Sequence, residues 1–397
     1  MSGRQTRRRY LATLGVAGAV GIAGCSNDSD NRTPTGDPSI PADIGRWATF
    51  GYDAANTGSA PQETGPTTNV IVQWQFPTGK QVFSSPTVVD GSLYVGSNDA
   101  NVYCLSAVTG AEQWRFTTDD LVRSSPTVAD GTVYVGSYDG YLYALSTGSG
   151  ELEWKFEAGA SGNPLVSGYP FAAAPTVVDD TVYVGSSDDS VYALDAENGD
   201  EQWSFETGGQ VRTTPAVADG TVYVGSGDDT VYALSAADGA EQWAFDTGNS
   251  VDASPAASGG SVYVGTSGGD VLSLSAADGS VQWRSERGGE VVASPAVAEE
   301  AVFVGNTDGS VSALSTADGG EQWTFETDGA VRSPPSVAGG NVYVGSDDNT
   351  LYILSTGDGL VQWELATDGS VEASPAIADG VVFTASADGS VYGLTSP

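Results

Sequence analysis

A repeat that recurs every 40 residues, with one step of 49, constrains the fold of this chain more than any other feature. Each copy holds four short apolar segments. The first contains a proline, the second reads Val-Tyr-Val-Gly or a close variant, the third ends near a leucine and the fourth carries a tryptophan. Four strand-like segments in a unit of this length are typical of one blade of a β-propeller. The prolines are Pro86, Pro126, Pro175, Pro215, Pro255, Pro295, Pro335 and Pro375.

The phase of the repeat predicts how the ring closes. In the last copy the third segment, 391–394, is not followed by a tryptophan segment. At the other end of the chain the first tryptophan segment, 70–76, is not preceded by a third segment. Pairing the two would complete an eighth blade and remove the open edge of the ring. The sequence therefore predicts an all-β, eight-bladed β-propeller of four-stranded antiparallel blades over residues 70–397, closed by an N-terminal outer strand. An open solenoid is the alternative. The tryptophans are Trp74, Trp114, Trp154, Trp203, Trp243, Trp283, Trp323 and Trp363.

The tryptophan segments resemble the repeat of the quinoprotein-type, or PQQ-like, propeller family, whose motif is Ala-x-Asp-x-x-x-Gly-x-x-x-Trp. Residues 193–203 match the motif in full, and residues 233–243 and 313–323 match with serine in place of the aspartate. The resemblance implies that the eight tryptophans dock between neighbouring blades and are structural. Residues 47–58 resemble the lead-in found before such propellers, so residues 46–69 are predicted to be an N-terminal lead-in segment.

The family contains enzymes as well as non-enzymatic proteins. It includes pyrroloquinoline-quinone dehydrogenases and the BamB-type lipoproteins of outer-membrane assembly. The chain resembles the BamB-type proteins in size, blade number and predicted lipidation, and it lacks the large inserts and adjacent cysteines usual in the dehydrogenases. We therefore expect a non-enzymatic, monomeric scaffold for proteins or envelope components, with no cofactor and no catalytic residue. A PQQ-dependent oxidoreductase and a carbohydrate-active extracellular enzyme are the alternatives.

The first 25 residues have the pattern of an export signal. A charged start is followed by an apolar core, 11–23, and by the small residues before Cys25. The pair Arg7-Arg8 resembles a twin-arginine signal, and Ile-Ala-Gly-Cys resembles a lipobox. These patterns predict twin-arginine export, lipid attachment at Cys25 and a place on the extracellular face of the cell membrane, with residues 26–45 as a flexible linker. A transmembrane anchor or a plain secreted protein is the alternative.

The charge of the chain excludes several classes of function. Acidic residues outnumber basic ones 51 to 14, and four of the basic residues lie in the first 25, so the remainder carries a net charge of −41. Such a surface repels nucleic acid, and it indicates adaptation to brine, as in haloarchaeal proteins, with an acidic binding surface as the alternative. The chain has no histidine, which excludes Ser–His–Asp catalysis and His-ligated metal sites. The acidic turn pairs lack the ligand spacing of a calcium loop, so no metal is expected.

A candidate partner site follows from one position of the repeat, three residues before each proline. Three of its eight occupants are arginines, Arg123, Arg212 and Arg332. The position opens the innermost strand, so these side chains are predicted to ring one entrance of the central channel and to bind an acidic peptide or another anion. The long connection over residues 158–171 enters at the same face and adds Tyr169 and Phe171 as candidates.

A purely structural role is the alternative for this position. Arg212 would then pair with Asp252 on the next blade, and Arg332 with Glu372, so that both pairs hold neighbouring blades in register. Arg123 has no acidic neighbour at this position, which makes it the best candidate to contact a ligand.

The anchoring prediction is tested by Cys25→Ser. Without the thiol no lipid can be attached, so the variant should be released into the medium or remain unprocessed. Fractionation and the size of the mature chain provide the measurement. A variant that stays in the membrane at its normal processed size would contradict lipidation.

The charge predicts that stability depends on salt. Repulsion among the carboxylates is screened at molar salt, where the screening length is about 3 Å, so the melting temperature should fall as potassium chloride is lowered. Thermal melts over a salt series measure this. A melting temperature indifferent to salt would contradict the adaptation to brine.

Overall fold

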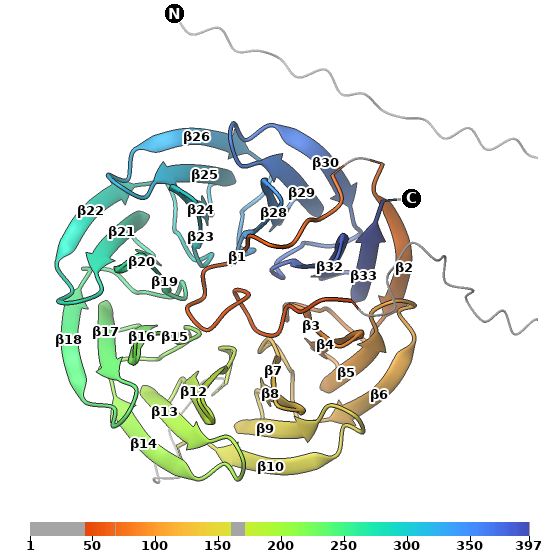
Figure 1. Ribbon diagram of the computed structural model, residues 1–397, viewed down its shortest axis with the longest axis horizontal. Helices are drawn as coiled ribbons and strands as arrows, with labels where there is room; N and C mark the ends of the chain where they lie inside the picture. The colour runs from red at the N-terminus through yellow and green to blue at the C-terminus, as the bar shows by residue number, and fades with distance from the viewer. Residues whose placement is uncertain (1–43, 68, 160–170, 397) are drawn as a thin grey trace, which may run out of the picture. The chain divides into compact units, whose positions relative to one another are not determined.

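The computed structural model describes residues 44–67, 69–159 and 171–396, and within them it confirms the predicted all-β propeller. Eight antiparallel sheets stand around a common centre as the blades of a ring (Figure 1). None of the described residues forms a helix, so no helix there could cross a membrane. The predicted export signal 1–25 and nearly all of the linker 26–45 lie outside the described residues.

The first four blades each contain four strands that follow one another in the chain. Blade 1 is β3 (Thr87–Val89), β4 (Ser92–Ser97), β5 (Asn101–Ser106) and β6 (Glu112–Thr117). Blade 2 is β7 (Thr127–Ala129), β8 (Thr132–Gly136), β9 (Tyr141–Ser146) and β10 (Leu152–Glu157). Blade 3 is β11 (Thr176–Val178), β12 (Thr181–Gly185), β13 (Ser190–Asp195) and β14 (Glu201–Glu206). Blade 4 is β15 (Ala216–Ala218), β16 (Thr221–Gly225), β17 (Thr230–Ser235) and β18 (Glu241–Asp246).

The next three blades repeat this arrangement. Blade 5 is β19 (Ala256–Ser258), β20 (Ser261–Gly265), β21 (Asp270–Ser275) and β22 (Val281–Glu286). Blade 6 is β23 (Ala296–Ala298), β24 (Ala301–Gly305), β25 (Ser310–Ser315) and β26 (Glu321–Glu326). Blade 7 is β27 (Ser336–Ala338), β28 (Asn341–Ser346), β29 (Thr350–Ser355) and β30 (Val361–Ala366), and the two-residue strand β1 (Ser59–Ala60) adds to its inner edge.

Blade 8 joins the two ends of the repeat array, as predicted. It contains β31 (Ala376–Ala378), β32 (Val381–Ser386), β33 (Ser390–Thr395) and, as its outer strand, β2 (Ile71–Pro77) from the N-terminal part. The antiparallel register pairs Ile71 with Thr395 and Pro77 with Ser390. Every blade therefore has two neighbours, and no sheet is left at an open end of the ring.

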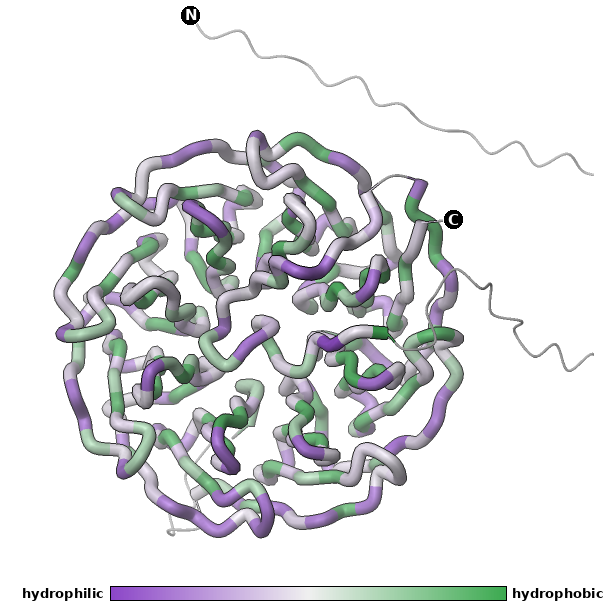
Figure 2. Tube along the Cα trace, in the orientation of Figure 1, coloured by the Kyte–Doolittle hydropathy of each residue, from purple (hydrophilic) through white to green (hydrophobic). Residues whose placement is uncertain are grey.

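Burial within a blade follows from its place between two neighbours. Every residue of β16 is buried, whereas the outer strand β18 exposes most residues but buries Trp243. The hydropathy of the chain fits this pattern, since much of the rim of the ring is hydrophilic (Figure 2). A β-bulge precedes the tryptophan in all eight outer strands; in blade 4 the register shifts between Ala233, opposite Trp243, and Leu234, opposite Glu241. A bulge turns a side chain away from its regular direction, and here it aims the indole at the next blade.

At seven of the eight seams the tryptophan makes the same contact with the next blade. The Nε1 atom of Trp203 donates a hydrogen bond of 3.0 Å to the carbonyl of Ala236, in the turn between the third and fourth strands of the next blade. Gly239 in this turn has φ +70°, and a Cβ atom there would lie 2.6 Å from the indole, so only glycine allows the ring to pack so closely. The same bond joins Trp74 to Ala107, Trp114 to Thr147, Trp154 to Ala196, Trp243 to Ala276, Trp283 to Thr316 and Trp323 to Thr356.

At five seams a second contact joins a phenylalanine of the outer strand to a tyrosine in the third strand of the next blade. Phe205 packs edge-on against Tyr232, with ring centroids 5.4 Å apart. The hydroxyl of Tyr232 donates a bond of 2.7 Å to the carboxylate of Asp228, which also accepts the backbone N–H of Gly208. Burial opposes ionisation of Asp228, but these bonds hold its pKa below the ordinary value. The carboxylate therefore ties an outer strand to the neighbouring hairpin.

The lead-in crosses the centre of the ring and pairs with the inner strands (Figure 1). Trp47 exchanges two backbone hydrogen bonds with Val88 of blade 1, and β1 pairs in parallel with β27. The side chain of Asn56 is buried and donates from Nδ2 to the carbonyls of Thr214 and Pro255. Backbone carbonyls of the lead-in also accept the N–H groups of Val128, Val217, Ala257, Val297 and Val337. The lead-in thus satisfies the inner edges of six blades.

The closing seam can be tested with Trp74→Ala. The indole of Trp74 is buried, donates to Ala107 and packs against Phe383, so its loss should lower the free energy of unfolding by about 3–5 kcal/mol. Chemical unfolding followed by circular dichroism measures the change. Trp363→Ala is the matched control and should cost less, because Trp363 is only half-buried and faces blade 8, where no turn joins β33 to β2. Equal losses would contradict the seam account.

Candidate functional site

The two faces of the ring differ because strand connections of different kinds end on them. One face carries two kinds of connection. These are the turns between the second and third strands of each blade and the segments that lead from each outer strand to the next inner strand. The hydrogen bond from Asn98 N–H to the Gln81 carbonyl joins one of each kind. We call this face the mouth face. The opposite face carries the other turns and receives the lead-in, where Asp379 N–H donates to Glu63. We call it the lead-in face.

Arg123 lies on the mouth face in an aromatic clamp formed with Phe83 and Tyr138. Its guanidinium carbon is 4.6 Å from the centroid of the Phe83 ring and 5.7 Å from that of Tyr138. The Nε atom donates a 3.2 Å bond to the side-chain oxygen of the buried Asn98. These contacts hold an exposed guanidinium in one orientation, which lowers the entropy that it loses on binding a ligand.

The other two arginines of the mouth have acidic partners. Arg212 pairs with Asp252 of the next blade at 3.9 Å, as the structural alternative predicted, and also bonds to Gln210. The expected pair of Arg332 with Glu372 is wrong. Arg332 instead donates at 3.1 Å to Asp347, in the turn between β28 and β29 of its own blade, because this turn lies beside the start of the inner strand.

Glu372 is a half-buried carboxylate of this face, as are Asp252 and Asp347. Glu372 accepts a 3.0 Å hydrogen bond from Ser370. Burial raises its pKa above the ordinary value, and the charges of Arg332 and Arg123 oppose this shift. Arg123 therefore does have an acid within electrostatic reach, although no carboxylate of the described residues lies within ion-pair distance of it. The mouth is an entrance of mixed charge in which Arg123 is the arginine best placed to receive a carboxylate.

The two aromatic candidates from the long connection have different outcomes. Tyr169 lies outside the described residues. The prediction that Phe171 contributes to a partner site is wrong, because its side chain is fully buried and packs over Gly136. It stands four residues before Pro175, where Val122 and Val211 stand in the neighbouring repeats and cover the equivalent glycines. Counting back from the proline would have identified it as a core residue.

The remaining cysteine and arginine predictions concern residues outside the described part of the chain and one buried cysteine. Cys25, Arg7 and Arg8 lie outside the described residues. Cys104 is buried, and burial raises the pKa of its thiol to about 12, so the thiol stays protonated at neutral pH. Within residues 44–67, 69–159 and 171–396, no three Asp, Glu or Cys side chains are placed to hold a metal ion.

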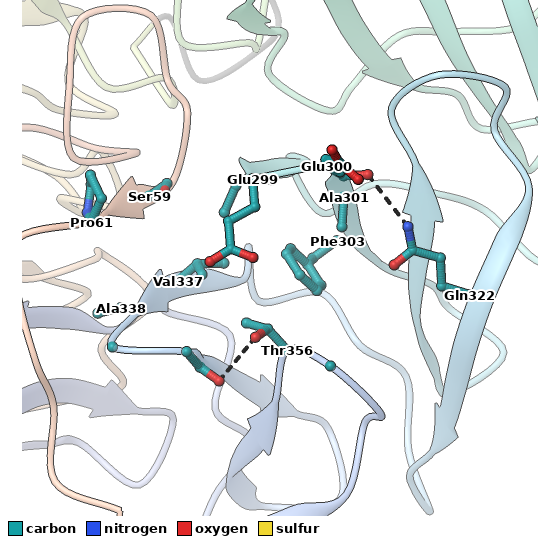
Figure 3. A pocket seen from close by; sticks show the side chains of 14 residues that line it. Ser59, Pro61, Glu299, Glu300, Ala301, Phe303, Gln322, Val337, Ala338 and Thr356 are labelled. Atoms are coloured by element: carbon teal, nitrogen blue, oxygen red, sulfur yellow. Dashed lines mark hydrogen bonds between the residues drawn. The ribbon is translucent and has the colours of Figure 1, made fainter.

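The sequence analysis missed a pocket on the lead-in face, between blades 6 and 7. It encloses about 500 Å³, and its walls include Glu299, Phe303 and Val337, with Ser59 and Pro61 of the lead-in at one side (Figure 3). Smaller grooves lie at the equivalent seams between blades 1 and 2 and between blades 2 and 3. The available signal was the segment 299–303, Glu-Glu-Ala-Val-Phe, which departs from the repeat at several positions at once.

Comparison with known proteins agrees with the fold. The family model described as "Outer membrane protein assembly factor BamB" matches residues 71–169, 166–307, 228–336 and 307–396. No curated protein matches the chain.

Several solved structures share the fold. BamB from Moraxella catarrhalis is 20% identical, with a TM-score of 0.69, 82% of this chain covered and 97% of that one. The quinohemoprotein alcohol dehydrogenase from Comamonas testosteroni is 16% identical, with a TM-score of 0.75 and 88% and 80% covered. A europium-containing methanol dehydrogenase is 15% identical, with a TM-score of 0.76 and 92% and 98% covered. The same architecture thus occurs in an assembly factor and in enzymes.

Proposed function

Since the chain belongs to the family of the outer membrane protein assembly factor BamB, we propose that it is a non-enzymatic scaffold that holds a protein partner on its mouth face. It acts as a monomer, exported by the twin-arginine pathway and tethered through a lipid on Cys25 to the extracellular face of the cell membrane. The partner presents a carboxylate, from an acidic side chain or a chain end, to Arg123.

The observation that carries this proposal is the aromatic clamp around Arg123. Phe83 and Tyr138 hold the guanidinium, and Asn98 occupies its Nε atom. Within the part of the chain that the structure describes, the two Nη nitrogens make no hydrogen bond or ion pair. An oriented guanidinium with two spare nitrogens suits a carboxylate, which it can bind through two parallel hydrogen bonds.

A quinone cofactor of the kind suggested by the quinohemoprotein neighbour suits the mouth poorly. Pyrroloquinoline quinone carries carboxylates, and Asp252, Asp347 and Glu372 stand at the same entrance as the arginines. Arg212 and Arg332 are engaged by two of these acids, so little positive charge is free to offset the repulsion. These residues favour a partner with a single carboxylate over a cofactor with several.

The test is Arg123→Ala in the full chain, with partners recovered by pull-down from native membranes at the salt concentration that keeps the protein folded. Loss of the bidentate contact should reduce recovery by about tenfold or more, since a hydrogen bond to a charged group contributes about 1.5–3 kcal/mol. Arg123→Lys should not restore recovery, because an ammonium cannot reproduce the planar pair of donors.

Arg212→Ala is the matched control on the same face and should change recovery little, because Arg212 is already paired with Asp252. A melt of each variant verifies folding. Undiminished recovery with folded Arg123→Ala would overturn the role of the mouth. Stoichiometric binding of added pyrroloquinoline quinone, seen as its absorbance co-eluting with the protein, would favour the oxidoreductase instead.

A further inference from the structure

The pocket between blades 6 and 7 lies beside two positions of blade 6 at which most other blades have a hydroxyl group and blade 6 has none. Blade 6 has Ala301 and Phe303 where most blades have hydroxyl-bearing residues, and it has two glutamates, Glu299-Glu300, at the turn; all four residues line the pocket (Figure 3). Blade 8 also lacks both hydroxyls, at Val381 and Phe383, but it keeps Asp379-Gly380 at its turn. Because the seams are otherwise built alike, each departure can be compared with its equivalents in the same molecule.

The first departure is Ala301, at the start of the second strand. In five other blades this position is serine or threonine, and its hydroxyl donates to the side-chain oxygen of the residue before the tryptophan. These pairs are Ser92–Gln113, Thr132–Glu153, Thr181–Gln202, Thr221–Gln242 and Ser261–Gln282. In blade 6 the equivalent Gln322 turns its Nε2 atom to the carbonyl of Glu300 at 3.4 Å. Its Oε1 atom accepts no hydrogen bond from the described residues.

The second departure is Phe303, two residues further along β24. Six other blades have tyrosine at this position, and in three of them the hydroxyl, of Tyr134, Tyr183 or Tyr223, donates at 3.1–3.4 Å to a carbonyl of the next blade. Each of those carbonyls also accepts the seam tryptophan. Phe303 has no hydroxyl, so among the described residues the equivalent carbonyl, on Thr356, accepts only Trp323 at 2.7 Å. Its second lone pair is left without a donor.

The third departure is the turn itself. Asp-Gly is used at Asp130-Gly131, Asp219-Gly220 and Asp379-Gly380, whereas blade 6 has two glutamates. Glu299 adopts the left-handed conformation, with φ +54°, which costs a residue with a side chain some strain. Its carboxylate points into the pocket and lies between Phe303 and Val337 in the view of Figure 3. The turn therefore places a charge beside apolar side chains.

From this pattern we propose that the pocket binds an arginine side chain presented by a partner polypeptide. The site offers a carboxylate and two uncharged oxygens, from Glu299, Gln322 and Thr356, and the two hydroxyl donors of the repeat are missing. A guanidinium has five donors and no acceptor, and it matches such a set. The methylene groups of the arginine pack on the apolar side chains of Phe303 and Val337.

Acidic composition alone does not account for this pocket. A surface adapted to brine gains carboxylates, but that adaptation does not remove hydroxyls. Blade 8 lacks the same two hydroxyls, and blade 6 alone combines their loss with a pair of glutamates at the turn. The two smaller grooves at other seams retain the hydroxyls, through Ser92 and Tyr94 in one groove and Thr132 and Tyr134 in the other. The pocket lies on the lead-in face and is independent of the partner site proposed at Arg123.

The test uses a fluorescein-labelled pentapeptide, Gly-Ser-Arg-Ser-Gly, and the same peptide with citrulline, which has the shape of arginine but no charge. Fluorescence anisotropy is measured with the full chain at the salt concentration that keeps it folded. The arginine peptide should bind at least about tenfold more tightly than the citrulline peptide, because charged hydrogen bonds are the stronger ones.

Two variants restore the residues of the other blades. Phe303→Tyr should reform the hydroxyl bond to Thr356, and Ala301→Thr the bond to Gln322. Each should weaken binding of the arginine peptide about tenfold while the melting temperature stays equal or rises. Glu299→Gln should also weaken binding. The matched control Asp219→Asn removes a charge from the same turn of blade 4 and should leave binding unchanged, as should Arg123→Ala.

Equal binding of the arginine and citrulline peptides, including no binding of either, would overturn the proposal. So would a folded Phe303→Tyr protein that binds the arginine peptide as the wild type does. Because Arg123→Ala belongs to the other face, its effect on membrane pull-down reports on the proposed function separately from these measurements.

Discussion

The contact on which the ring depends is an indole ring laid on a glycine of the next blade. The bulge before each tryptophan aims the indole, and at seven of the eight seams a glycine allows its close approach and a carbonyl accepts a hydrogen bond from Nε1. This contact uses apolar area, shape and one directional bond, and it uses no charge. The seams can therefore repeat around a molecule with a net charge of −37, whose carboxylates stay at turns and outer strands.

Much of the fold could be predicted because the sequence repeats. Each strand of a blade contains a characteristic residue at a fixed spacing, and the unmatched segments at the two ends predicted how blade 8 is completed, as the pairing of β2 with β33 confirms. The lead-in was predicted as a segment, but its path across the centre was not. Its bonds come from backbone carbonyls, such as those of Ala48 and Thr57, and a backbone bond leaves no trace in the side chains.

Side-chain partners at the mouth were harder to predict. A long arginine can reach an acid on its own blade or on the next one, and the register of the repeat does not decide between them. Arg332 pairs with Asp347 of its own blade, whereas Arg212 pairs with Asp252 of the next blade. Phe171 was misassigned because the insertion before it hid its place in the repeat. The pocket between blades 6 and 7 was visible only as small losses, since an absent hydroxyl is less conspicuous in a sequence than an added charge.

Blade 8 also governs when the chain can reach its final structure. Its outer strand, β2, is synthesised more than 300 residues before β33, with which it pairs, and the lead-in just ahead of β2 rests on inner strands from blades throughout the ring. Contacts so distant in sequence form late, because the loop between them must first be ordered. Individual blades can form while the chain emerges from the ribosome, but the ring can lock only after the last strand has been released. Completion of the fold is thus a property of the finished polypeptide, and an incomplete chain has no way to close.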